Sequence, residues 1–214
     1  MTRLLLSTML LMAPAVAAGQ ARPSALETAA AVQQKYDRVR DFTAEFTHTY
    51  EGGVLNRKST ERGTVQIKKP GRMRWEYTAP DKKVFVSDGR KIYSYIPVDK
   101  QVIVGDVPTD DEATTAVLFL AGKGSLTRDF NVKYAEGTTE GVLALRLDPK
   151  RKQRDYDWLV LGVDPKTMQI RSLTAADQQG GRSTFEFSKY RENTGLTDAL
   201  FNFKIPRGAD VISR

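Results

Sequence analysis

The stretch that decides the fold is residues 68–77, which reads Lys68-Lys69-Pro70-Gly71-Arg72-Met73-Arg74-Trp75-Glu76-Tyr77. It begins with a Pro-Gly turn signal, and after the turn large apolar side chains alternate with charged ones. A period of two is typical of a β-strand with one buried face and one exposed face. A second turn signal, Asp88-Gly89, follows the apolar run at 84–86. The region therefore predicts neighbouring antiparallel strands.

The same rhythm continues along most of the chain. A first helix is expected at Ala25 to Arg40, where Ser24 and Glu27 form an S-x-x-E capping box. From Asp41 onward the period changes to two. Strands are expected at 41–50, 60–68, 72–77, 82–87, 90–96, 100–106, 131–135, 142–147, 156–163, 168–176, 182–190 and 202–205. Short strands separated by turn residues predict an antiparallel sandwich or barrel.

A helical segment interrupts the strands at residues 109–130. Thr109 and Glu112 form a second capping box, and a short helical turn is expected around 125–129. The apolar residues at the end of the main helix are Val117, Leu118, Phe119 and Leu120. A helix that is apolar all round must contact apolar surface on more than one side. We therefore expect Val117, Leu118 and Leu120 to belong either to the core or to a movable lid over a ligand cavity.

The hairpin at Asp88-Gly89 offers a second prediction. A two-residue turn would pair Ser87 with Arg90 and Phe85 with Ile92, and it would leave both faces of the hairpin apolar. This pattern fits a curved sheet lined by ligand-binding side chains, and simple core packing accounts for it equally well. If a ligand binds, the expected lining residues are Phe46, Met73, Trp75, Phe85 and Ile92. Methionine beside aromatic rings suits an apolar ligand of variable shape.

The N-terminus has the order of a secretory signal peptide. Arg3 precedes an apolar run, and small residues follow. We expect residues 1–21 to be removed by cleavage near Ala18 or Ala21, which leaves residues 22–214 as a single exported domain. The sequence has no cysteine, so disulfides, lipid attachment at a thiol and thiolate metal sites are excluded.

Charge and composition argue against several functions. The formal net charge is +7, or +6 without Arg3, but the cations are spread along the chain and an exported protein meets little nucleic acid. We expect no nucleic-acid partner and a monomer. His48 is the only histidine, which rules out multi-histidine zinc sites and leaves one candidate base for catalysis. We expect no catalytic residue, metal or cofactor, and a secreted hydrolase remains an alternative.

Several segments together resemble the LolA family of periplasmic outer-membrane lipoprotein carriers. They are DFTAEFT at 41–47, PGRMRWEY at 70–77, VSDG at 86–89, Phe130 and LFNFKIP at 200–206. The resemblance implies a mainly β fold with helices (α+β), an incomplete antiparallel β-barrel whose apolar concave face is covered by a helical lid. It also implies a periplasmic, non-enzymatic chaperone that binds lipoprotein acyl chains. Its partners would be an inner-membrane ABC transporter and an outer-membrane lipoprotein acceptor.

One position departs from the family pattern. Many relatives have arginine directly before the proline, where it bonds to carbonyls of the lid helices, whereas this chain has Lys69. Lysine cannot reproduce the planar fork of arginine, so we expect a weaker or differently made lid latch at Lys69. A second alternative remains open: a sensor of the same fold that binds lipid or lipoprotein and signals to a membrane partner. The sensors of this kind carry an additional C-terminal domain.

Overall fold

The computed structural model describes residues 22–52, 57–107, 120–122, 124–136, 141–153 and 155–213. The predicted signal peptide, residues 1–21, lies outside these ranges. Helix α1 (Ala25–Asp37) begins with the predicted capping box, because the Ser24 hydroxyl accepts the Glu27 N–H and the Glu27 carboxylate accepts the Ser24 N–H. It ends before the predicted Arg40, and the N–H of Val39 closes a turn onto the Tyr36 carbonyl at 3.0 Å.

Twelve strands among the described residues form one sheet. They are β1 (Asp41–Gly52), β2 (Arg57–Lys68), β3 (Arg72–Ala79), β4 (Lys83–Asp88), β5 (Lys91–Ile96), β6 (Gln101–Asp106), β7 (Phe130–Tyr134), β8 (Leu143–Pro149), β9 (Trp158–Val163), β10 (Ile170–Ala176), β11 (Arg182–Glu192) and β12 (Asp210–Ser213). The short helical elements are η1 (Pro97–Asp99), α3 (Leu126–Asp129) and η2 (Asp198–Phe201).

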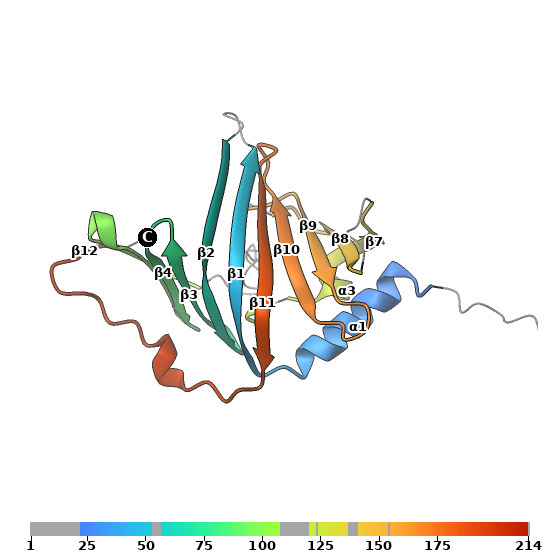
Figure 1. Ribbon diagram of the computed structural model, residues 1–214, viewed down its shortest axis with the longest axis horizontal. Helices are drawn as coiled ribbons and strands as arrows, with labels where there is room; N and C mark the ends of the chain where they lie inside the picture. Colours follow the sequence, from blue (N-terminus) through green and yellow to red (C-terminus); the bar gives the residue numbers. More distant parts are fainter. Residues whose placement is uncertain are drawn as a thin grey trace, which may run out of the picture.

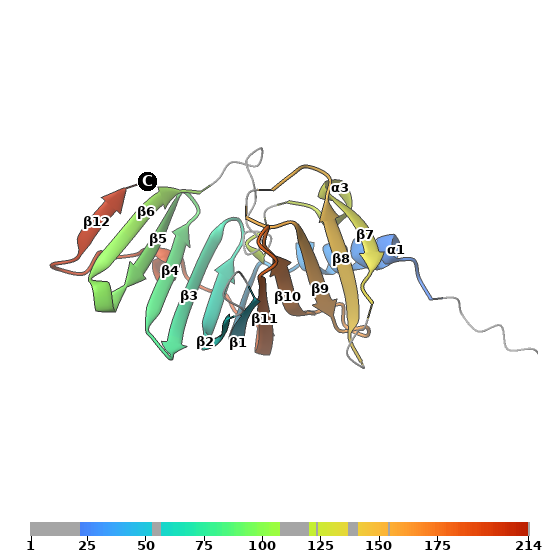
Figure 2. The same ribbon diagram turned by 90° about the horizontal axis from the view of Figure 1, so that it is seen from above.

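The sheet is open, as predicted for an incomplete barrel. Its strand order is β12-β6-β5-β4-β3-β2-β1-β11-β10-β9-β8-β7, and β12 and β7 form its two edges. Figure 1 shows the central strands, and Figure 2, seen from above, shows both ends of the sheet bending toward the same side. All neighbouring pairs are antiparallel except β12 and β6, which are parallel. The curvature defines a concave face and an outer face.

The end of the chain differs from its prediction. Residues 202–205 were expected to form a strand, but they are extended without a strand partner, and the last strand is β12. The reason is packing: Phe203 lies on the outer face of the sheet, with ring centroids 5.4 Å from Tyr93 and 6.2 Å from Tyr95. The alternating apolar residues therefore pack this part of the chain against the sheet without adding a strand to it. We call residues 193–209 the C-terminal segment; it runs along the outer face before β12 (Figure 1).

The hairpin register also differs from its prediction. Ser87 pairs with Ile92 and Phe85 with Ser94, so the loop is longer than two residues. The Asp88 carboxylate stabilises this wider loop by accepting the N–H groups of Arg90 and Lys91, both at 2.7 Å. Because the register moves by an even number of positions, each side chain keeps its predicted face.

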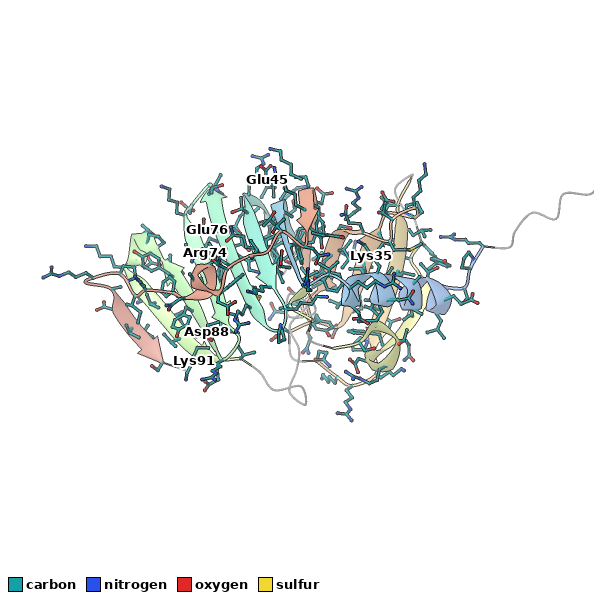
Figure 3. All side chains as sticks on the ribbon, turned by 90° about the horizontal axis from the view of Figure 1, so that it is seen from below. Lys35, Glu45, Arg74, Glu76, Asp88 and Lys91 are labelled. Atoms are coloured by element: carbon teal, nitrogen blue, oxygen red, sulfur yellow. The ribbon has the colours of Figure 1, made fainter. Side chains whose placement is uncertain are left out.

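Helices cover one half of the concave face. Helix α1 contacts α3 and β7, and Ala29, Val32 and Tyr36 of α1 are buried in the main core. Leu145, Leu161 and Leu173 continue this core across β8, β9 and β10. Over β3 the outer face is polar by contrast: Figure 3 shows Arg74 and Glu76 beside the C-terminal segment, and Arg74 donates to the Leu200 carbonyl at 3.4 Å. Over β5 the same face carries the tyrosines on which Phe203 packs. The sheet is therefore apolar on the side toward which it curves.

Candidate functional site

The concave face brings together the five lining residues expected from sequence. Cross-strand pairing places Trp75 opposite Phe85 and Met73 opposite Ser87. Ser87 pairs in turn with Ile92, so Met73 and Ile92 lie on the same face. Phe46 on β1 belongs to the same face, since it pairs with Gly63, which in turn pairs with Tyr77. Phe46, Met73 and Trp75 are buried, and Phe85 and Ile92 are half-buried. That they bind lipid stays a prediction.

An aromatic cluster occupies the centre of this face. The Phe46 ring centroid lies 5.1 Å from Trp75 and 4.9 Å from Tyr77 in edge-to-face contacts. Phe185 on β11 joins the cluster at 5.1 Å from Trp75, and Phe187 lies 6.2 Å away. Sequence reasoning did not select these two phenylalanines, although their alternation with Thr184 and Glu186 carries the same period-two signal.

A glycine makes room for the Phe46 ring. A Cβ on Gly63 would lie 2.7 Å from Phe46 Cζ and 2.1 Å from the carbonyl oxygen of Glu76. Neither distance leaves room for a methyl group. The absence of a side chain at Gly63 therefore allows β1, β2 and β3 to pack one aromatic ring directly onto the backbone.

The Trp75 indole has an unusual property at this centre. The residue is 3% exposed, and its Nε1 has no hydrogen-bond partner among the residues that the structure describes. Other buried polar side chains are paired: the Ser87 hydroxyl donates to the Gly71 carbonyl at 2.8 Å, and Thr28 bonds to the Tyr134 hydroxyl at 2.7 Å. A buried unpaired donor costs about 1–3 kcal/mol, so this N–H is an exception that calls for an explanation.

The expected lid falls only partly within the described residues. Val117 and Leu118 lie outside them, whereas Leu120 is buried. Three hydrogen bonds hold the segment 120–122 and its neighbours: the Tyr36 hydroxyl donates to the Leu120 carbonyl, the Gly71 N–H donates to the Ala121 carbonyl at 2.8 Å, and Lys69 donates to the Tyr36 carbonyl. These contacts join α1, the 120–122 segment and the turn before β3 at one point, which we call the lid junction.

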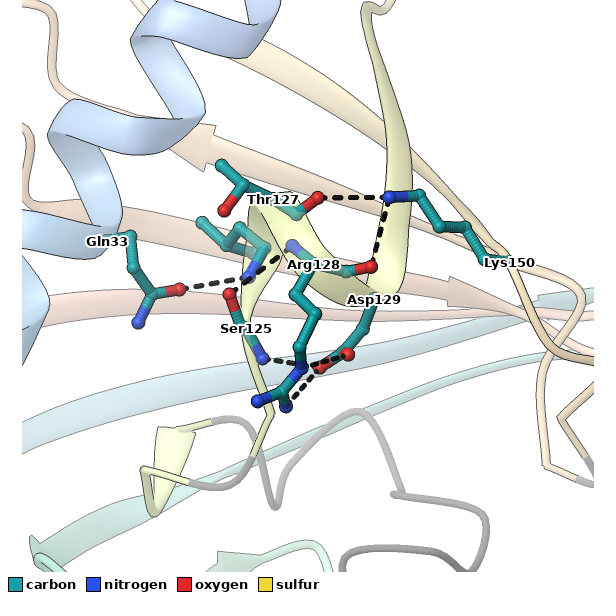
Figure 4. A network of polar contacts seen from close by, with 7 residues as sticks. Gln33, Ser125, Thr127, Arg128, Asp129 and Lys150 are labelled. Carbon is teal, nitrogen blue, oxygen red and sulfur yellow. Dashed lines mark hydrogen bonds and ion pairs between the residues drawn. The ribbon is translucent and has the colours of Figure 1, made fainter.

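The neighbouring helix α3 is fixed by a second polar network (Figure 4). Gln33 of α1 accepts the Leu126 N–H at 2.9 Å, which ties the two helices together. The Asp129 carboxylate accepts the Ser125 N–H at 2.6 Å, and Lys150 donates to the carbonyls of Thr127 and Arg128 at 3.1 and 3.0 Å. Lys150 therefore closes the C-terminal end of α3.

Lys69 occupies the centre of the lid junction. Its ammonium donates to the carbonyl of Tyr36 in the last turn of α1 and lies 3.6 Å from the centroid of the Tyr36 ring. Burial lowers the pKa of Lys69 from 10.5 to about 8, although the carboxylates of Asp37 and Glu192 oppose this effect. Burial likewise raises the pKa of Tyr36, so its hydroxyl remains a proton donor. A helix C-terminus favours a cation, and the contact is geometrically able to act as a latch.

The single histidine lies at one end of the aromatic cluster. His48 Nδ1 is 3.1 Å from Glu61, its Nε2 is 2.7 Å from the Ser183 hydroxyl, and its ring stacks on Phe185 with centroids 4.2 Å apart. Burial lowers the pKa of His48, which Glu61 only partly opposes. Ser183 is paired with both β1 and β10, so its backbone is engaged in the sheet and does not form an oxyanion hole. We interpret the arrangement as a structural hydrogen-bond network.

The described ranges offer neither a metal-ligand cluster nor a membrane-spanning helix. They contain no group of three or more His, Cys, Asp or Glu residues able to hold a metal ion. Within the same ranges, no helix combines the length and the apolar character needed to cross a membrane.

An open antiparallel sheet with an apolar concave face and helices packed over it places the chain in the class of incomplete β-barrels. The chain belongs to the family described as outer membrane lipoprotein carrier protein LolA, whose profile matches residues 37–204. The family resemblance is thereby confirmed, and the open, mainly β sheet expected from sequence is the one that the structure shows.

Individual relatives agree over most of their length. The chain is 33% identical over 201 residues to an outer-membrane lipoprotein carrier protein of Methylibium petroleiphilum, with 93% of this chain and 94% of that protein covered. It is 30% identical over 193 residues to one of Chromohalobacter salexigens, with 90% and 89% covered. An uncharacterized conserved protein from Thermus thermophilus has a similar structure, with a TM-score of 0.53 at 14% identity over 88% of this chain and 98% of that one. That last likeness concerns the fold alone.

Proposed function

We propose that this protein is a periplasmic chaperone that binds the acyl chains of lipoproteins on its concave face. The observation that carries the proposal is the continuous apolar cluster from Phe46 through Met73 and Trp75 to Phe85 on the concave face, in a family member whose relatives are named lipoprotein carriers. Burying one methylene is worth about 0.8 kcal/mol, so a sixteen-carbon chain represents about 12 kcal/mol. Such a chain crosses an aqueous compartment only if a protein shields it.

The proposed pathway begins with export. Residues 1–21 act as a signal peptide, and the remaining chain works in the periplasm as a single, non-enzymatic domain. It receives lipoproteins from an inner-membrane ABC transporter and delivers them to an outer-membrane lipoprotein acceptor. Release requires that the ligand is not held irreversibly, and a lid that packs on the empty concave face competes with the ligand and so moderates its affinity.

The lid junction supplies the closing contacts in this scheme. Moving Leu120 away from α1 breaks its bond with the Tyr36 hydroxyl and the bond between Gly71 and Ala121. Moving α1 itself breaks the Lys69 contact with the Tyr36 carbonyl. Val117 and Leu118 complete the proposed lid. Opening therefore exchanges a small set of hydrogen bonds for access of the acyl chains to Met73 and Trp75.

A charge placed on the concave face tests the proposal. Met73→Glu puts a carboxylate among the acyl chains and should abolish release of lipoproteins from inner-membrane vesicles. Gln66→Glu is the matched control, because it adds the same charge to the outer face of the adjacent strand, opposite Arg74. Equal release by both variants, each shown to be folded by circular dichroism, would refute binding at this face.

The latch has its own test. Lys69→Leu removes the ammonium from the end of α1 and should favour the open state, so that cargo is still accepted but handed on poorly to an acceptor membrane. Lys69→Arg should be tolerated, since arginine donates to the same carbonyls. Normal transfer with Lys69→Leu would place the latch elsewhere.

A further inference from the structure

We propose that the indole N–H of Trp75 is a hydrogen-bond donor for the carbonyl oxygen that ends each acyl chain of the cargo, so that the site recognises acyl groups and not hydrocarbon alone. The inference rests on the proposed function and extends it. It assigns a polar contact at the centre of a face that is otherwise apolar.

Within the described part of the chain, the surroundings of Trp75 offer this donor no partner. Its nearest aromatic neighbours are Phe46, Phe185 and Phe187, whose rings carry no oxygen acceptor. The only other unpaired buried side-chain atom among the described residues is Oε1 of Gln153, whose Nε2 still donates to the Arg151 carbonyl. Trp75 Nε1 is therefore an isolated donor on the concave face.

Packing alone does not account for an indole at this place. A buried tryptophan usually finds a partner for its N–H, and another aromatic ring would fill apolar space without a buried donor. An N–H left unpaired in the empty protein is satisfied if the bound ligand brings an acceptor. The donor that is unpaired in the empty protein then favours the binding of ligands that carry a hydrogen-bond acceptor.

The chemistry of the cargo limits what that acceptor is. A hydrocarbon chain has none, and the acceptors of an acyl group lie at its ester or amide end. A hydrogen bond from Trp75 would place this end of the chain near the row formed by Val65, Trp75 and Phe85. The contact would distinguish an acyl ester from an ether of the same length, which keeps the chain and lacks the carbonyl.

Binding of a matched pair of lipids tests the inference. Dioctanoyl phosphatidylcholine and dioctyl-ether phosphatidylcholine share chain length and head group, and isothermal titration measures their affinities. The natural protein should bind the ester about tenfold more tightly, equivalent to about 1.4 kcal/mol. Trp75→Phe should bind both lipids alike. Trp158→Phe is the control, because Trp158 lies under the guanidinium group of Arg146 at 4.3 Å and should leave the preference unchanged.

A spectroscopic measurement covers the case in which Trp75→Phe does not fold. The sequence has two tryptophans, so in Trp158→Phe the only indole N–H resonance is that of Trp75. It should move downfield with the ester lipid and not with the ether. Equal affinity of the natural protein for both lipids, an ester preference retained in Trp75→Phe, or an unchanged resonance would overturn the inference. Failure of the natural protein to bind either lipid would overturn the proposed function itself.

Discussion

The buried position of Lys69 predicts that the protein becomes more stable as the pH rises above neutrality. The Lys69 pKa is about 8 in the folded state and 10.5 as the ordinary value. Between these values the unfolded chain binds more protons than the folded one, so the free energy of unfolding increases with pH. The stability gained by deprotonation of Lys69 is complete above pH 10.5 and is lost as the pH falls through about 8.

The magnitude follows from the two pKa values. From pH 7 to pH 9.5 the linkage amounts to about 2 kcal/mol, and since the side chain is only about half-buried, solvent screening reduces it to about 1 kcal/mol. Tyrosine acts in the opposite direction at the upper end of this range, because its ordinary pKa is 10.0 and the unfolded chain begins to release these protons first. Burial raises the pKa of Tyr36, Tyr77 and Tyr190, which keeps these three protonated in the folded protein over the whole range.

Urea denaturation at pH 7 and pH 9.5 measures the effect. Between these pH values the natural protein should gain about 1 kcal/mol relative to Lys69→Met, which has no ammonium to titrate and shares the same tyrosines. Lys189→Met is the control: the Lys189 side chain is 70% exposed and pairs with Glu45 on the surface. The same pH dependence in the natural protein and in Lys69→Met would refute the reasoning. If opening of the lid exposes Lys69, the same linkage favours the closed state as the pH rises, so cargo should be loaded less readily and handed on more readily.

Three other positions give predictions that rest on particular contacts. Gly63→Ala should destabilise the protein by about 1–3 kcal/mol or more in thermal or urea unfolding, because its methyl group would meet Phe46 and the Glu76 carbonyl. Gly105→Ala is the control and should have a much smaller effect, because no atom lies within 4 Å of its Cβ. Burial lowers the pKa of His48, so stability that is present above pH 6.5 should be lost as the pH falls through the pKa of the folded state. His48→Gln, in a chain with no other histidine, should remove that loss, and a pH profile unchanged by this substitution would contradict the prediction. Phe203→Ala should loosen the C-terminal segment at a cost of about 1–2 kcal/mol and increase hydrogen exchange in β12, and unchanged exchange there would show that β6 alone holds this strand.

Much of the fold follows from local pattern. The period of two in residues 72–77 predicts β3 and assigns Met73, Trp75 and Tyr77 to one face, because a pleated strand leaves each side chain only two directions. The capping box at Ser24 predicts the start of α1 for an equally local reason. The order of the family segments, from residues 41–47 to 200–206, identifies the family. The faces of the hairpin are also correct, since they depend on the parity of the register and not on the length of its loop.

Sequence alone does not decide which segments meet. The alternation at 202–205 marks one apolar side, but only the folded sheet determines that Phe203 packs on Tyr93 and that the parallel partner of β6 is β12. In the same way, the lid junction joins residues 36, 69 and 120 through hydrogen bonds between distant parts of the chain. The unpaired N–H of Trp75 is visible only once Phe46 and Phe185 surround it. Periodicity determines the direction of a side chain, whereas its partners and its burial depend on how the whole chain closes around it.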